Sequence, residues 1–277
     1  MSIANPLGDL TYNHTEYNKD SFSGSASAEI NPIKGLTITA RYGINIDNVR
    51  YNDLGNSYIG QSASYEGTAQ QIAYRNYGLD QQYIADYDFT IADVNNFDIT
   101  AGYDGYQYKY DRISGYGTHL YNPESYFLSN ATSDFSISGY QDTYSTKGYF
   151  GRINYNYDSK YLFNASVRRD ASSRFSEDNR WGTFFALSAG WLISNEDFLS
   201  TDWIDMLKLK GSFGEQGNDD IGNYYAYTDQ YTMTGADGIY SDAVLSYKGN
   251  PDITWETSVT YNVGFDFAFL RNHITGS

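Results

Sequence analysis

Residues 36–47 alternate without exception between two kinds of side chain, reading Leu36-Thr37-Ile38-Thr39-Ala40-Arg41-Tyr42-Gly43-Ile44-Asn45-Ile46-Asp47. Every even position is apolar or aromatic, and every odd position is polar or glycine. Successive side chains of a β-strand point to opposite faces, so we expect a strand with one apolar and one polar face.

The same alternation returns along the chain, and the connections between its repeats differ in length. Those near 31–35, 94–96 and 158–160 are short, whereas those near 48–81 and 109–142 are long. Short turns at one end and long loops at the other are typical of an antiparallel up-and-down transmembrane β-barrel. We therefore predict an all-β fold with about nine or ten strands of a larger barrel. Besides 36–47, strands are expected at 21–30, 83–91, 97–103, 145–157, 161–169, 185–193, 207–213, 255–269 and 274–277, with a helical turn in 194–206.

Composition limits the classes of function. The chain of 277 residues has 30 Tyr, no Cys and a formal net charge of −16. Nucleic acid is not expected as a partner, because phosphate binding needs clustered Lys and Arg. Without cysteine there is no disulfide and no thiolate metal site. No run approaches the roughly 18 apolar residues of a membrane helix, so any membrane crossing would use strands.

A soluble, secreted β-sandwich that binds glycans is an alternative, because its strands also alternate. Sandwich strands are usually shorter, at about 5–6 residues, and their loops need not alternate in length. Membrane strands need about 9–11 residues, and most of the expected strands reach that length. Aromatic residues near strand ends also favour a membrane barrel, which carries aromatic girdles at both interfaces. They are Tyr42, Tyr103, Tyr155, Tyr157, Tyr161 and Trp191.

The second half of the chain holds several recognisable segments. They are Arg169–Phe175, Asn179–Phe184, Ser188–Ser194, Leu207–Gly214, Gln216–Asn218, Ile221–Gly222 and Gly249–Thr257. In these segments the chain resembles SusC/RagA-type TonB-dependent transporters of the outer membrane. The resemblance is specific over about 165–270 and looser over 5–160. It departs at Phe185 and Leu192, where proline and a basic residue would be expected.

This resemblance implies that residues 1–277 are part of a receptor barrel of about 22 strands. It also implies that the plug domain, a signal peptide and the remaining strands lie outside this sequence. The implied location is the Gram-negative outer membrane, with outer-membrane lipids around the barrel. The implied partners are TonB, which would act through the missing N-terminal part, and a SusD-like surface lipoprotein that serves as a lid. No enzymatic activity and no cofactor are implied.

The resemblance further implies import of large nutrients, and we expect an oligosaccharide. A receptor for siderophores or other iron chelates, from the same superfamily, is the alternative. Arg174, Arg180 and Trp181 could clamp a ligand, but their place in a short loop favours a structural role, with Arg180 pairing to Glu177 or Asp178. We assign structural roles to the motif residues Arg174, Phe175, Arg180, Trp181, Gly182, Trp191, Gly217, Asn218 and Trp255.

The tyrosine-rich segment 217–253 is the candidate ligand-binding loop. Aromatic rings can stack on sugar rings, and Asp and Asn can bond to hydroxyls, which suits a glycan or a peptide. The same tyrosines could instead hold the loops together or anchor the membrane interface. The candidates are Tyr224, Tyr225, Tyr227 and Tyr231.

The sequence gives no catalytic or metal-binding constellation. His14, His119 and His273 lie in unrelated loops or turns, without a second His at metal-ligand spacing. Four basic residues are expected on the polar face, where they would contact the plug or line a solvated pore. They are Arg152, Arg168, Lys208 and Lys210.

Overall fold

The computed structural model describes residues 6–199, 201, 203–236 and 239–277. Among these residues no helix has the length and hydrophobicity needed to cross a membrane. The helical elements are short: α1 (Pro6–Tyr12), α2 (Gly60–Ala63), η1 (Leu128–Asn130), η2 (Ile193–Asn195) and η3 (Asp197–Leu199). The strands are β1 (His14–Ile33), β2 (Leu36–Gly55), β3 (Thr68–Ile91), β4 (Asn95–Leu120), β5 (Ala131–Tyr157), β6 (Tyr161–Ser172), β7 (Trp181–Leu192), β8 (Ile204–Asn218), β9 (Gln230–Ala236), β10 (Ile239–Tyr247), β11 (Glu256–Phe269) and β12 (Ile274–Gly276).

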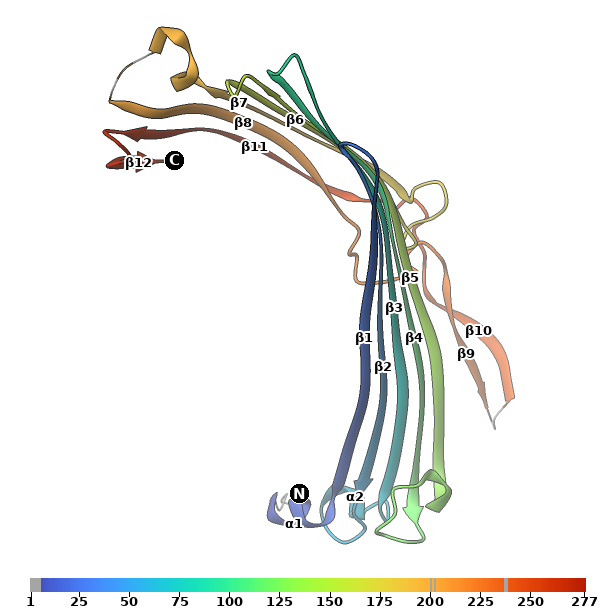
Figure 1. The fold of residues 1–277 in the computed structure, drawn as a ribbon. Helices are drawn as coiled ribbons and strands as arrows, with labels where there is room; N and C mark the ends of the chain where they lie inside the picture. The colour runs from blue at the N-terminus through green and yellow to red at the C-terminus, as the bar shows by residue number, and fades with distance from the viewer. Residues whose placement is uncertain (1–5, 200, 202, 237–238) are drawn as a thin grey trace. The chain divides into compact units, whose positions relative to one another are not determined.

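Ten strands form one sheet in the order β1-β2-β3-β4-β5-β6-β7-β8-β11-β12, and β9 and β10 form a separate hairpin (Figure 1). From β5 to β12 each neighbouring pair is antiparallel. Apart from the β9–β10 hairpin, which is inserted between β8 and β11, neighbours in sequence are neighbours in the sheet, which confirms the predicted up-and-down order. The described sheet begins at β1 and ends at β12 without closing.

The chain forms two compact units, and β1 to β5 each contribute to both. Unit 1 comprises residues 1–25, 43–79 and 107–143, and unit 2 comprises 26–42, 80–106 and 144–277. Unit 1 has a small core, in which Tyr126 and Leu128 pack on four buried residues. These are Leu54, Ala69, Leu120 and Ala131.

Two of the predicted loops are wrong. Most of 48–81 belongs to β2 and β3, which leaves only 56–67 as the connection. Most of 109–142 belongs to β4 and β5, which leaves 121–130. Polar side chains occupy both odd and even positions over most of these extensions, which hides the apolar alternation that marks a strand. The strands β1 to β5 have 20–27 residues, far more than the roughly 9–11 that a bilayer requires.

The segment 217–253 is also more ordered than a single loop. Strand β8 continues to Asn218, and the hairpin of β9 and β10 occupies most of the second half. The helical turn predicted within 194–206 is confirmed as the 3₁₀ helices η2 and η3.

The predicted short turns are confirmed between β1 and β2 and between β5 and β6. The turn predicted at 94–96 lies at 92–94 instead, because Asn95 already begins β4. Gly35 joins β1 to β2 with a φ of +83°, a value that glycine adopts without strain. Asp158 and Ser159 join β5 to β6 with φ of 48° and 52°, as in the mirror-image turns that match strand twist. A backbone hydrogen bond links this turn to the turn between β3 and β4, since Asp158 N–H donates to the carbonyl of Val94 at 2.8 Å.

In unit 2 the sheet has an apolar face and a polar face, as the alternation predicts. On β6 and β7 the apolar face carries Phe163, Val167, Phe185 and Leu187, each more than 40% exposed in the described chain. Val167 lies directly opposite Phe185. The other face carries the polar side chains of the same strands, such as Asn164. Exposed large apolar side chains in this number need an apolar surrounding, which a bilayer supplies.

Candidate functional site

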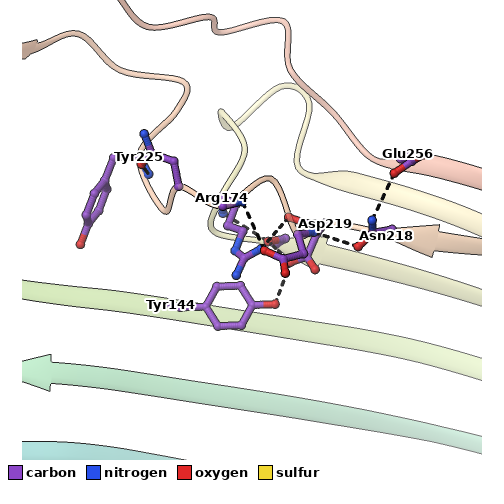
Figure 2. A network of polar contacts seen from close by, with 10 residues as sticks. Tyr144, Arg174, Asn218, Asp219, Tyr225 and Glu256 are labelled. Atoms are coloured by element: carbon purple, nitrogen blue, oxygen red, sulfur yellow. Dashed lines mark hydrogen bonds and ion pairs between the residues drawn. The ribbon is translucent and has the colours of Figure 1, made fainter. Parts of the chain in front are cut away.

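A network of polar contacts ties the segment after β8 to β5 and to the loop after β6 (Figure 2). The Asp219 carboxylate accepts hydrogen bonds from Tyr144 Oη at 2.7 Å and from Ser172 Oγ at 2.6 Å. The Arg174 guanidinium donates to the Asp219 carbonyl at 3.0 Å and pairs with the Asp220 carboxylate. We call these five residues the loop clasp.

Stacking and charge reinforce the loop clasp. The Arg174 guanidinium lies 4.7 Å from the ring centre of Tyr144 and 5.1 Å from that of Tyr224. Burial, with the neighbouring Asp219, raises the pKa of Tyr144. The hydrogen bond from Arg174 holds the pKa of Asp220 below its usual range. At neutral pH Tyr144 therefore keeps its proton to donate, and Asp220 is an anion paired with Arg174.

Side-chain turns shape the segment that follows β8. Asn218 Oδ1 accepts from the backbone N–H of Asp220 at 3.0 Å, and Asp220 Oδ1 accepts from that of Gly222 at 3.3 Å. Asn223 Oδ1 then accepts from the N–H of Tyr225 at 2.8 Å. Asx turns of this kind need Asn or Asp two residues before the donor, so the local sequence alone specifies this path.

An aromatic cluster lies next to the loop clasp. Phe175 is fully buried, with its ring centre 5.6 Å from that of Trp255, and Phe184 contacts the same indole at 5.5 Å. A Cβ at Gly182 or at Gly217 would collide with the Phe184 ring. These two positions require glycine because the ring lies across the backbone there.

The aromatic cluster is extended by hydrogen bonds between two loops. Trp255 Nε1 donates to the carbonyl of Arg180 at 2.8 Å, and Asn179 Nδ2 donates to that of Pro251 at 2.9 Å. The loop 173–180 and the segment 248–255 are therefore held against each other.

The remaining motif residues lie around these clusters. The predicted pairing of Arg180 with Glu177 or Asp178 is wrong: no ion pair between described residues includes Arg180, and its Nε is buried without a partner there. Trp181 stacks on Tyr149 with ring centres 6.3 Å apart.

Trp191 lies at the opposite end of β7. Its Nε1 donates to Glu196 at 2.9 Å, and Tyr161 donates to the same carboxylate oxygen at 2.7 Å. This pair of bonds fixes the start of the β7–β8 connection.

The four candidate ligand tyrosines differ in environment. The Tyr224 ring packs 5.6 Å from Tyr144 and 6.4 Å from Tyr225, and Tyr224, Tyr225 and Tyr227 are half-buried. Tyr231 is on β9 and is 59% exposed. The structure brings Tyr224 and Tyr225 together, and it places Tyr231 on the hairpin.

A second group of tyrosines, in unit 1, was not predicted from the sequence. Tyr17 and Tyr74 share a hydrogen bond of 3.2 Å, and the ring centres of Tyr74, Tyr110 and Tyr140 follow at steps of 5.7 Å. The Arg112 guanidinium lies 5.9 Å from the Tyr140 ring. We call the four tyrosines the tyrosine row. Tyr106, Tyr108 and Tyr110 alternate in the sequence, and this was the signal that could have indicated a strand.

The tyrosine row borders a hollow of about 800 Å³, lined in part by Tyr74, Arg112 and Tyr140. The hydrogen bond with Tyr17 raises the pKa of Tyr74 to about 12. Its phenol is therefore neutral at physiological pH and keeps a polar edge beside an apolar ring, the combination that a sugar or a peptide can use.

The polar face of unit 2 holds another hollow, of about 1070 Å³, lined in part by Asn154, Asn164, Lys208 and Lys210. Of the four basic residues expected on this face, three are paired with carboxylates. Arg168 donates to Asp104 at 2.8 and 2.9 Å, and the others pair as Arg152 with Asp98 and Lys210 with Asp266.

Comparison with known families identifies the barrel directly. The family model described as "TonB dependent receptor-like, beta-barrel" matches residues 2–277. The TonB-dependent receptor SusC of Bacteroides thetaiotaomicron is 39% identical over 121 residues, which are 41% of this chain and 12% of SusC. A TonB-dependent receptor of Formosa agariphila is 25% identical over 98% of this chain and 28% of its own length.

Solved structures agree. A structure of the RagAB peptide transporter superposes with a TM-score of 0.87 at 25% identity, over 96% of this chain and 30% of that chain. The open-open state of the RagAB peptide importer gives a TM-score of 0.84. The chain thus spans less than a third of the relatives it matches. It belongs to the TonB-dependent receptor β-barrel family and is of the SusC/RagA type.

Proposed function

We propose that the full receptor imports oligosaccharides across the Gram-negative outer membrane. Its ligand would be captured beneath a SusD-like surface lipoprotein, and a plug domain outside this sequence would open on a signal from TonB. Residues 1–277 would contribute barrel strands, including the long hairpins of β1 to β5. Family membership supports the transporter class, and the name SusC supports the lipoprotein partner.

The tyrosine row is the observation that carries the choice of an oligosaccharide. Its four phenol rings follow one another, and two of them, Tyr74 and Tyr140, line the hollow of about 800 Å³. Tyr17 and Tyr140, at its two ends, are 57% and 50% exposed. Ring faces can cover the apolar faces of sugars, and phenol hydroxyls can bond to sugar hydroxyls.

Peptides are the second candidate. The relative of known structure is named a peptide transporter. The hollow beside the tyrosine row is also lined by charges of both signs, including Asp20, Arg75 and Asp111. A peptide, with its charged ends, would complement such a lining better than a neutral sugar would.

We also propose roles for the residues named from the sequence. Tyr231 would contact ligand from the hairpin, while Tyr224, Tyr225 and Tyr227 would mainly hold the segment after β8 in place. The nine motif residues would position loops without touching the transported ligand. The contacts of Trp255 with Phe175 and with the carbonyl of Arg180 support this role.

The test uses the full-length receptor purified with its lipoprotein partner. Binding of neutral oligosaccharides, peptides and ferric chelates is compared by isothermal titration calorimetry. We expect oligosaccharide binding to weaken about fivefold in Tyr140→Ala and to persist in Tyr140→Phe, because the ring is worth about 1 kcal/mol. Tyr121→Ala is the matched control, since Tyr121 is 90% exposed on a loop.

The outcomes separate the candidates. Binding of peptides alone would replace the oligosaccharide proposal with the peptide one, and binding of ferric chelates alone would favour an iron-chelate receptor. Equal losses in Tyr140→Ala and Tyr121→Ala would show that the tyrosine row is not the binding surface.

A further inference from the structure

Two cations share one indole on the apolar face of unit 2. Lys147 Nζ lies 5.3 Å from the ring centre of Trp181, and the Arg169 guanidinium lies 5.2 Å from it. The strand register explains the meeting: Ala171 faces Lys147 on one side and Trp181 on the other, and Arg169 faces Tyr149. Lys147, Tyr149, Arg169 and Trp181 therefore lie on the same face, and we call them the basic aromatic patch.

Neither cation has an acidic partner in the part of the chain that the structure describes. No ion pair between described residues includes Lys147 or Arg169, although the chain has a net charge of −16. On the opposite face, Arg168 is held by two carboxylates. Glu215, on the same face as the patch, instead accepts from the N–H of Phe185 at 3.2 Å. Two exposed positive charges are thus available to a ligand from the membrane side.

Position along β7 places the basic aromatic patch at a membrane interface. Trp181 and Trp191 begin and nearly end the strand, about ten residues or 33 Å apart along it. At the usual tilt of about 40° this gives a height of about 25 Å, the thickness of the apolar band of an outer-membrane barrel. Phe185 and Leu187, both exposed, lie between the two indoles. Trp181 is at the end of the strand that leads into the loop 173–180, away from the short β5–β6 turn.

We propose that the basic aromatic patch binds a phosphate-bearing lipid headgroup of the outer leaflet. Lys147 and Arg169 would pair with the phosphate, and the Tyr149 hydroxyl would donate a hydrogen bond to it. Exposed Val167 and Phe185, directly below on the same face, would contact the acyl chains. This apolar continuation selects a lipid over a free anion, because a soluble anion gains nothing from it. The proposal needs only the membrane barrel, and not the oligosaccharide substrate.

The experiment measures lipid binding to the full-length receptor. The receptor is released from detergent in the mass spectrometer after incubation with dioleoyl phosphatidic acid, dioleoyl phosphatidylcholine or inorganic phosphate. We expect phosphatidic acid to bind in preference to phosphatidylcholine, and the double variant Lys147→Gln/Arg169→Gln to bind it about thirtyfold more weakly. Lys208→Gln, which removes a charge from the opposite face, is the matched control and should bind like the wild type.

Three results would overturn the proposal. They are equal binding of the two lipids by the wild type, equal losses in the double variant and in Lys208→Gln, and displacement of phosphatidic acid by millimolar inorganic phosphate. Heat-modifiable migration shows whether each variant is folded. Lys147→Gln alone, expected to lose about fivefold, replaces the double variant if that one does not assemble.

Discussion

Truncation of Phe175 tests whether the aromatic cluster holds the loop 173–180 against the segment 248–255. Phe175 is fully buried, and its ring contacts Trp255. Phe175→Ala removes a buried ring that packs on Trp255, and the same indole is contacted by Phe184. The surroundings cannot collapse into the space, because Phe184 is itself wedged against Gly182 and Gly217.

The cost follows from the burial. Truncating a fully buried phenylalanine to alanine costs about 3–5 kcal/mol, including the cavity that remains. The hydrogen bonds that Phe175 supports join loop 173–180 to its neighbours. The lost free energy therefore favours local opening of this loop and not unfolding of the membrane strands. A loss of 3 kcal/mol raises the open population by about two orders of magnitude. Phe175→Leu keeps much of the side-chain volume, so its free-energy cost should be about a third of the cost of Phe175→Ala.

Hydrogen exchange by mass spectrometry on the full-length receptor measures this opening. The informative amides are those of Ser172 and Asn179, which donate to Arg180 and Ser176 at 3.1 Å each. We expect about hundredfold faster exchange in Phe175→Ala and an intermediate rate in Phe175→Leu. Phe198→Ala is the control, since Phe198 is 71% exposed. Exchange within threefold of the wild type in Phe175→Ala would refute the reasoning.

Two further predictions concern backbone strain and charge. Gly35→Ala should lower the temperature at which the heat-modifiable form is lost, and by more than Gly222→Ala does. Both glycines have positive φ, which costs an alanine about 1–2 kcal/mol. Only at Gly35 would the added Cβ also collide with a backbone carbonyl, that of Asp88. Arg174→Gln should speed hydrogen exchange of the amides in 218–225 at neutral pH. Arg174 lowers the pKa of Asp220 in the folded state, so the ion pair stabilises the fold fully above the unfolded carboxyl pKa of about 4. This stabilisation is lost as the pH falls through the lower pKa of the folded state. A difference between Arg174→Gln and the wild type that persisted unchanged at pH 2 would contradict this origin.

The parts of the fold that were predicted correctly depend on neighbours in the sequence. Alternation with a period of two is a local property of a strand between lipid and water, and it located β6, β7, β8 and β11 closely. The turns at 34–35 and 158–160 could be predicted because turn geometry depends on two or three residues. Most of the strand extensions could not, because polar side chains on both sides of a strand obscure its period. The alternating Tyr106, Tyr108 and Tyr110 were the exception.

In the candidate site, too, the features that depend on local sequence could be predicted, and those that depend on distant residues could not. The motif residues were found by resemblance, and the Asx turns after Asn218 follow from local sequence. The loop clasp depends on Tyr144 and Asp219, which are 75 residues apart. The tyrosine row joins four strands. Tyr74, Tyr110 and Tyr140 lie in segments predicted to be loops, and Tyr17 lies before the first predicted strand.

The sequence by itself determined that this chain forms an antiparallel membrane sheet, which face of that sheet is apolar, and to which family the chain belongs. These properties are repeated at every second residue or written in contiguous motifs. Only the tertiary structure decided how far the hairpins extend and which tyrosines share a surface. It alone also showed that Lys147 and Arg169 meet over one indole. These features depend on the register between strands that are distant in sequence, and hydrogen bonds across the sheet set that register.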